Sequence, residues 1–300
     1  MVRQNSPDDE TRILPEQYWA ADQVSLQGRQ LAVRWYRWQL LLLVAAAVIG
    51  SVPWRGTPLL AAAAFLGAGW FWFRLRSANP QARWHEARAA AESFKTLAWK
   101  YAVRAHPFQG PADSAEAEER YLQHLAHLGQ LLDQNPGTVP PGTEPEVGDG
   151  LRELRAAPLA TRRARYLSAR VDEQRVWYRA RAEACESQSA YWSLVVGALT
   201  ILGTAAAIAD AATALPVPVF AAFAAAATAV IAWTQLQQLR PLATAYLLAA
   251  GELLIISGRL STLDLNSPDA EESWARLSAD AEESISREHT TWRARRAFVR

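Results

Sequence analysis

Residues 38–54 read WQLLLLVAAAVIGSVPW and carry no charge, and residues 56–73 are also uncharged after the single Arg55. A second pair of uncharged segments, residues 191–209 and 211–239, is divided by the single Asp210. A helix of about 17 residues rises roughly 25 Å, close to the hydrocarbon thickness of a bilayer at about 30 Å. The pattern therefore predicts two transmembrane helical hairpins.

The average composition of the 300-residue chain conceals this pattern. Its mean hydropathy of −0.10, net charge of +1 and 20% charged residues would also suit a soluble protein. Buried hairpins of a soluble bundle, the alternative interpretation, would show an amphipathic period. Residues 40–50 and 218–233 are instead apolar on every side. We therefore predict an all-α membrane protein in which long cytoplasmic helices form a bundle.

The distribution of arginine predicts the orientation in the membrane. Arginines flank both hairpins on the side of the termini and of the central segment, whereas the loops inside the hairpins hold only Arg55. By the positive-inside rule, both termini and the central segment are cytoplasmic, and the loops at residues 52–57 and 210–216 are outside. The only cysteine, Cys185, cannot form an internal disulfide and would lie on the reducing side.

Proline and capping residues divide the cytoplasmic sequence into helices. Helix starts are predicted at Pro15, Pro80, Asp113 or Ser114, Pro241 and Ser267. Residues 135–150 are rich in proline and glycine and have no apolar period, which predicts a flexible linker. We therefore expect a first two-transmembrane domain at residues 1–134 and a second at residues 151–300, which repeats the plan of the first.

Three separated segments resemble a known family. Residues 91–101 (AESFKTLAWKY), 166–178 (YLSARVDEQRVWY) and 282–292 (EESISREHTTW) are similar to the SLATT family, the SMODS- and SLOG-associating two-transmembrane effector domains. The resemblance implies tandem SLATT domains over most of the chain. It also implies a bacterial cell-membrane effector that disrupts the membrane or forms a pore when a nucleotide-signalled defence or conflict pathway is activated.

Catalytic, cofactor and metal sites are not expected from the residues. Gly67 and Gly69 lie within an apolar segment, where small residues favour helix packing over phosphate binding. His124 and His127 share a helical face and could meet a metal, but no third ligand is evident. A pairing of Cys185 with His289 would join residues far apart in the chain. We therefore predict no enzymatic activity and no cofactor.

Charged residues in the cytoplasmic segments offer candidate contacts. The arginines between residues 162 and 181 alternate with acids, which favours intrahelical pairs and anionic lipid over a nucleic-acid partner. Glu92 could pair with Lys95 on its own helix, and Glu252 with Arg259 across the bundle. These are candidate bundle or gating pairs, with ordinary salt bridges as the alternative.

The apolar segments contain few polar groups. Asp210 is a candidate charge at the outer mouth of a pore, although solvation of a helix end would also explain it. Ala222 and Ala226 lie one turn apart and are candidate helix-packing positions for a homo-oligomer. Two functions stay open: an effector that assembles in the lipid bilayer, and a membrane-anchored adaptor that recruits a cytoplasmic protein.

Overall fold

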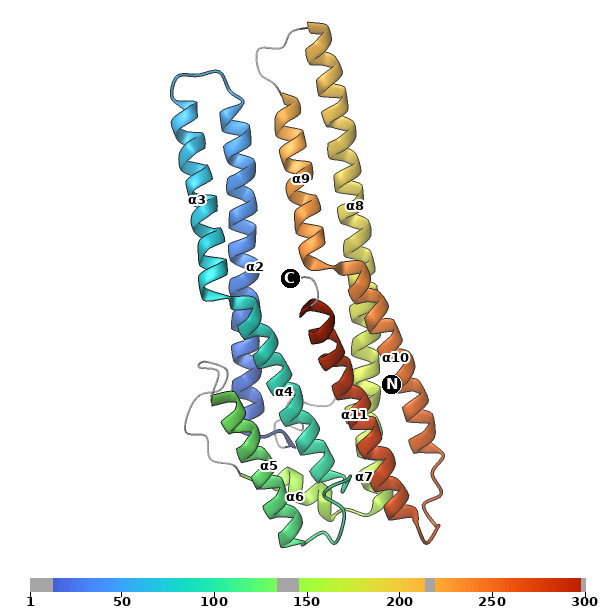
Figure 1. The fold of residues 1–300 in the computed structure, drawn as a ribbon. Helices are drawn as coiled ribbons and strands as arrows, with labels where there is room; N and C mark the ends of the chain where they lie inside the picture. The colour runs from blue at the N-terminus through green and yellow to red at the C-terminus, as the bar shows by residue number, and fades with distance from the viewer. Residues whose placement is uncertain (1–12, 134–145, 214–218, 298–300) are drawn as a thin grey trace. The chain divides into compact units, whose positions relative to one another are not determined.

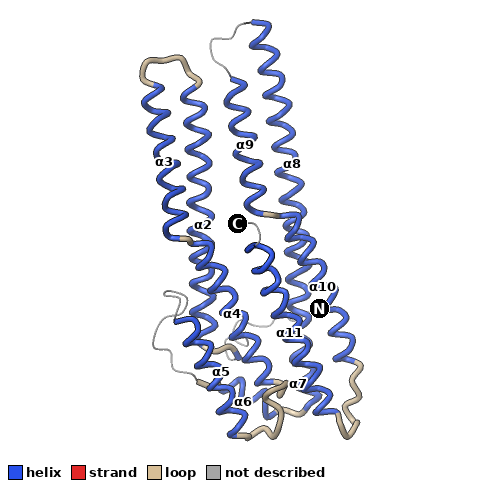
Figure 2. The backbone as a smooth tube through the Cα atoms, viewed as in Figure 1, coloured by secondary structure: helices blue, strands red, loops and turns tan. Residues whose placement is uncertain are grey.

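The computed structural model describes residues 13–133, 146–213 and 219–297. Helices joined by loops make up this part of the chain, which contains no strand (Figures 1 and 2). In chain order the elements are α2 (Glu16–Gly50), α3 (Thr57–Ala78), α4 (Pro80–Ala102), α5 (Ala115–Asp133), α6 (Asp149–Ala156), α7 (Leu159–Tyr166), the π-helix η1 (Leu167–Asp172), α8 (Glu173–Thr213), α9 (Val219–Gln237), α10 (Leu239–Ser261) and α11 (Ala270–Ala297).

The chain divides into two compact units, and both halves of the sequence contribute to each. The first, here called the bundle unit, comprises Met1–Gly28, Gln81–Arg179 and Leu247–Arg300. The second, here called the membrane unit, comprises Arg29–Pro80 and Ala180–Tyr246. The compact units therefore follow the contrast between charged and apolar sequence.

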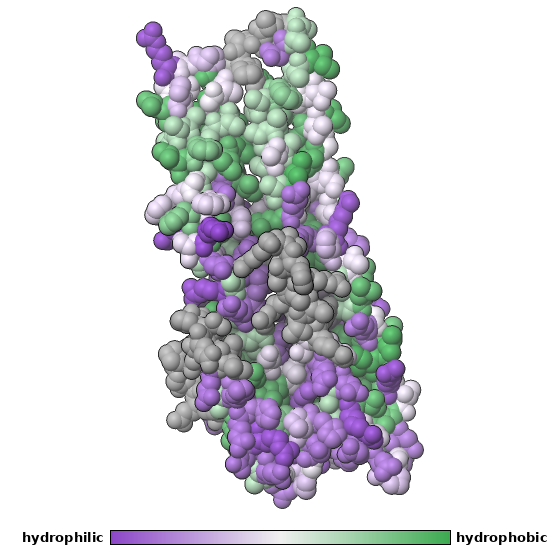
Figure 3. All heavy atoms as spheres, in the orientation of Figure 1, coloured by the Kyte–Doolittle hydropathy of each residue, from purple (hydrophilic) through white to green (hydrophobic). Residues whose placement is uncertain are grey.

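The membrane unit contains the two predicted hairpins. Four helical stretches are long and apolar enough to cross a membrane, namely Glu16–Gly50, Thr57–Ala102, Leu159–Ala212 and Val219–Ser261. Apolar side chains predominate in the upper part of the view, over the hairpin segments of α2, α3, α8 and α9 (Figure 3). The protein is therefore an all-α membrane protein, as the uncharged segments predicted.

Small residues let the two helices of each hairpin approach each other. A Cβ atom added to Gly67 of α3 would lie 3.2 Å from Leu42 Cδ1 of α2. A Cβ atom added to Gly203 of α8 would lie 3.1 Å from Phe223 Cβ of α9. Contacts this short leave little room for a side chain, so glycine permits the close packing of both hairpins.

A left-handed residue directly precedes the helix that follows each hairpin. Asn79 has a φ of 38° between α3 and α4, and Gln238 has a φ of 49° between α9 and α10. Because left-handed backbone interrupts an α-helix, each residue separates an apolar helix from the next helix. The second break moves the start of α10 to Leu239, two residues before the predicted Pro241.

The other predicted helix starts agree closely with the structure. α2 begins directly after Pro15, and α4 begins at Pro80 itself. The Ser114 hydroxyl accepts a hydrogen bond from the Ala117 amide at 3.2 Å, which caps α5. α11 begins at Ala270, after the Ser267 hydroxyl accepts a bond from the Asp269 amide at 3.3 Å.

The predicted linker at residues 135–150 lies mostly outside the described residues. Its described end is ordered, because Val147 is buried and α6 already begins at Asp149. α6 packs within the bundle unit through the buried side chains of Leu151, Leu154 and Arg155. The division into domains at residues 134 and 151 stays a prediction.

Candidate functional site

The core of the bundle unit contains a fully buried ion pair. The side chains of Arg170 in η1 and Glu282 in α11 have no exposed surface. Arg170 Nε donates to Glu282 Oε1 at 2.9 Å, and Nη2 donates to Oε2 at 2.8 Å. This two-pronged geometry matches the planar guanidinium to the carboxylate. Nη2 also donates to the hydroxyl of Thr96 in α4 at 3.3 Å, so the pair joins three elements.

Aromatic side chains enclose this ion pair. The Tyr166 hydroxyl donates to Glu282 Oε1 at 2.9 Å, and burial raises the pKa of this phenol well above its usual value. The Tyr166 ring packs edge-to-face against both Trp99 and Trp274, with centroids 5.8 Å apart in each case. Burial alone would lower the pKa of Arg170, but the charge and hydrogen bonds of Glu282 raise it instead. The arginine therefore stays charged inside an aromatic core.

Arg162 in α7 is the second buried arginine. Its Nη1 donates to the Val103 carbonyl and its Nε to the Ala157 carbonyl, both at 3.0 Å. Its Nη2 also donates to Glu271 of α11. The indole Nε1 of Trp274 donates to the same Val103 carbonyl at 2.7 Å. Two donors from the second half of the chain thus hold the backbone that follows α4.

Arg155 in α6 holds the loop after α4 in a similar way. Its Nη1 donates to the carbonyls of Tyr101 at 3.0 Å and Phe108 at 2.9 Å, and its Nη2 to that of Pro111 at 3.1 Å. The guanidinium lies 4.7 Å from the centroid of the Tyr101 ring. Burial lowers the pKa of both Arg155 and Arg162. Carbonyl oxygens thus replace the water that these cations lose on folding.

The prediction that these arginines form intrahelical pairs or touch lipid is wrong for Arg162 and Arg170. Arg175 does pair within its helix, with Asp172 at 3.2 Å. A signal for the buried set is present in the sequence, because Arg162, Tyr166 and Arg170 recur at every fourth position and therefore share one helical face. The sequence does not show which acid, among many, this face meets.

The other candidate charged pairs are Glu92 with Lys95 and Glu252 with Arg259, and the first of these pairs stays a prediction. Glu92 forms an ion pair with Arg88 at 2.9 Å, and Lys95 lies over the Tyr18 ring at 5.7 Å. Glu252 and Arg259 are both exposed and both lie on α10, seven positions apart. A pair between them would therefore run along one helix instead of across the bundle. A gating role for any of these residues stays a prediction.

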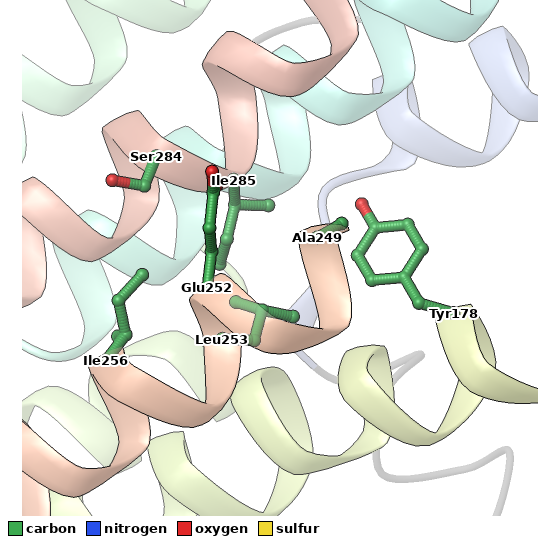
Figure 4. Close-up of a pocket in the computed structure, with 7 residues that line it drawn as sticks. All are labelled: Tyr178, Ala249, Glu252, Leu253, Ile256, Ser284 and Ile285. Atoms are coloured by element: carbon green, nitrogen blue, oxygen red, sulfur yellow. The ribbon is translucent and has the colours of Figure 1, made fainter. Parts of the chain in front are cut away.

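Glu252 lines a small cavity of the bundle unit. The cavity lies between α8, α10 and α11 and is lined by Tyr178, Ala249, Glu252, Leu253, Ile256, Ser284 and Ile285 (Figure 4). Its volume of about 10 Å³ is comparable to a single water probe. A nucleotide or another organic ligand does not fit in it.

The candidate positions of the membrane unit lie on the two apolar helices of the second hairpin. Asp210 is half-buried in the last turn of α8, and Ala222 and Ala226 are half-buried on α9. The hydroxyls of Thr200, Thr204 and Thr228 bond the carbonyl four residues earlier in their own helices, at 2.8 Å. These hydroxyls are therefore satisfied locally, and along the described helices of this hairpin they bond their own backbone and not one another.

Two of the residues considered for metal binding or nucleophilic chemistry, His124 and Cys185, are held in structural contacts, and the side chain of His289 lies outside the described residues. His124 Nδ1 donates a hydrogen bond to the Arg120 carbonyl at 2.7 Å, and its ring packs edge-to-face on Phe108. Among the described residues, no group of three histidine, cysteine or acidic side chains gathers at one point. Cys185 is buried and packs with Leu239 and Ala243. A buried thiol among apolar side chains serves as a structural residue and not as a reactive nucleophile.

Comparison with known proteins identifies both halves of the chain. Residues 15–163 match the family model "SMODS and SLOG-associating 2TM effector domain 3", and residues 166–292 match "SMODS and SLOG-associating 2TM effector domain 1". Comparisons with curated proteins and with solved structures returned no significant match. The chain therefore belongs to the SLATT family and carries two of its two-transmembrane effector domains in tandem.

Proposed function

We propose that this protein is a bacterial multi-pass effector that self-associates in the cell membrane and makes it leak in response to a nucleotide-signalled defence pathway. The two SLATT domains support the effector role, because the family is one of effector domains that associate with SMODS and SLOG proteins. The bundle unit then transmits the activating signal to the hairpins. No enzymatic step is required for this activity.

The observation that carries the proposal is the outward-facing apolar surface of the membrane unit. Leu59 and Leu66 of α3 and Leu194 and Ile201 of α8 are each more than 70% exposed. Such side chains suit lipid or another apolar helix. The threonine hydroxyls donate to their own helices, and in this proposal the conducting path forms where several copies assemble.

Leakage can be tested with the double variant Ala222→Leu/Ala226→Leu. Both alanines are half-buried on α9, and larger side chains there prevent close approach of a neighbouring helix. Insertion should be retained because leucine is at least as apolar as alanine. We expect crosslinked oligomers and dye release from vesicles to fall at least tenfold.

A matched control adds the same bulk to α3. Ala62 and Ala63 are exposed, so Ala62→Leu/Ala63→Leu should insert and release dye like the unaltered protein. Undiminished leakage from an α9 variant that crosslinking shows to be monomeric would contradict the proposal.

Orientation is a further expectation, with both termini and the central segment cytoplasmic. Thr57 is a poor labelling site because it is buried and its hydroxyl bonds the Val52 and Trp54 carbonyls at 2.7 Å. Gly56 and Glu116 are exposed, so Gly56→Cys and Glu116→Cys in a Cys185→Ala background are better probes. An impermeant maleimide added to intact cells should label the Gly56 site alone. Labelling of only the Glu116 site would show that the orientation is opposite to the one expected.

The second candidate function is a membrane-anchored adaptor. The absence of a polar path along the described helices of one copy favours it, because a pore needs a continuous wettable surface. An adaptor would capture a cytoplasmic protein at the bundle unit and release no dye at any density in the vesicle. Dye release by purified protein therefore separates the two functions.

A further inference from the structure

One face of α10 in the bundle unit is apolar and exposed. Leu247, Leu248, Leu254 and Ile255 are exposed by 49, 66, 48 and 62%, and Gly251 and Gly258 lie among them. These six residues, spaced three and four apart on one side of the helix, are here called the α10 face. Figure 3 shows apolar side chains along the edge where α10 lies. Contiguous apolar surface of this kind marks an interaction site.

The two glycines of this face have no role within one copy of the chain. A Cβ atom added to Gly251 or Gly258 would meet nothing within 4 Å, and neither residue has a positive φ. Glycine inside a helix lowers its stability relative to alanine. Their position in the middle of an exposed apolar stripe allows another backbone to come close.

The fold contains a second version of this helix. α4 and α10 both have 23 residues, and each follows the left-handed residue that ends a hairpin. α4 begins at Pro80, and α10 begins 159 positions later at Leu239. The same separation of 159 positions relates Asn79 to Gln238. At this offset of 159 positions, Gly251, Ile255 and Gly258 correspond to Glu92, Thr96 and Trp99 of α4.

On α4, the positions that match Ile255 and Gly258 contact the other SLATT domain. Trp99 is 2% exposed and packs edge-to-face on Tyr166, and Thr96 accepts a hydrogen bond from Arg170. Lys100, next to this face, forms an ion pair with Glu283 of α11 at 3.8 Å. The first domain thus uses this side of its helix to bind the domain that follows it in the chain. In the described structure, no domain covers the same side of α10.

We propose that the α10 face binds a second copy of this protein, head to tail, through that copy's first SLATT domain. The contact between domains inside one chain would then recur between chains. Copies in one membrane share one orientation, and a head-to-tail contact is compatible with this arrangement. Repetition of such a contact generates a ring when the rotation between neighbours closes.

The double variant Gly251→Leu/Gly258→Leu tests this contact. Open space surrounds both positions, so the variant should fold, and its helix propensity increases. The unaltered full-length protein in lipid nanodiscs or detergent should be oligomeric by light scattering. We expect the double variant to weaken association at least tenfold, because the added side chains hold the neighbouring helix away. Gly129→Leu, at an open glycine of α5, should leave the mass unchanged.

The variant also distinguishes a protein contact from a lipid contact. Leucine makes the face more apolar, so a face that rests on lipid would keep its contact and the oligomer would keep its mass, which would overturn the inference. The head-to-tail order is tested by Ile255→Cys in the Cys185→Ala background, because a symmetric contact would crosslink this site to itself on oxidation. Efficient self-crosslinking would overturn the head-to-tail arrangement.

The inference rests on the self-association proposed above and does not require leakage. If the unaltered protein is monomeric, both self-association and the α10 contact are contradicted. If the double variant remains oligomeric, only the α10 contact is contradicted. An oligomer that is lost in the double variant, with no dye release from either protein, would support the contact and contradict the leakage activity.

Discussion

Glu282→Gln should lower the free energy of unfolding by about 3–5 kcal/mol, because it leaves the Arg170 charge buried without its counter-ion. The neutral amide keeps one acceptor oxygen, but its NH2 group cannot accept the second prong of the guanidinium. At about 2–4 °C per kcal/mol, the apparent melting temperature should fall by about 10 °C in thermal unfolding followed by circular dichroism.

The neighbouring Glu283 provides the matched control. Its carboxylate is 62% exposed and lies 3.8 Å from Lys100, so Glu283→Gln should cost at most about 1 kcal/mol. The double variant Arg170→Met/Glu282→Leu should recover much of the lost stability, because an apolar pair needs no counter-ion. Equal melting temperatures for Glu282→Gln and Glu283→Gln would show that the buried pair does not stabilise the bundle unit.

Trp274→Ala should have a comparable effect, about 3–5 kcal/mol, because it removes a fully buried indole from the centre of the bundle unit. The variant loses the contact with the Tyr166 ring and leaves a cavity beside the Arg170–Glu282 pair. It also removes one of the two donors to the Val103 carbonyl. Urea unfolding in detergent should show a lower midpoint.

Two further variants separate these contributions. Trp274→Phe keeps most of the ring packing but loses the hydrogen bond to Val103, so its cost should be about 1 kcal/mol. Trp177→Ala removes a partly exposed indole of α8 and should have a smaller effect than Trp274→Ala. A free energy of unfolding for Trp274→Ala within about 0.5 kcal/mol of that of the unaltered protein, as expected for surface changes, would exclude Trp274 from the stabilising core.

The buried contacts also imply that the two SLATT domains unfold together within the bundle unit. Arg170 joins η1 to Thr96 of α4, and the Trp274 indole joins α11 to the Val103 carbonyl after α4. Each contact links two segments that are distant in the sequence. If one segment unfolds, the polar groups that it bonds in the other segment lose their partners. Glu282→Gln should therefore reduce protection against amide exchange in α4 as well as in α11.

The apolar hairpins could be predicted from the sequence because the bilayer imposes a local requirement. A run of uncharged residues long enough to cross the hydrocarbon core is visible without knowledge of any distant contact. Helix starts at Pro15 and Ser114 are also local, since a proline or a capping hydroxyl acts within one turn. The family resemblance rested on short segments in the same way, and the two family matches confirm it.

The pairing of charges could not be predicted, because many arginines and acids in the chain offer similar local patterns. The sequence places Arg162, Tyr166 and Arg170 on one helical face, but only the tertiary structure decides that Glu282 meets Arg170 and that Val103 receives the bond from Arg162. It also decides that α4 is covered while the matching face of α10 is exposed. The physical reason is that hydropathy and capping act along the chain, whereas burial of a charge depends on which helices pack around it.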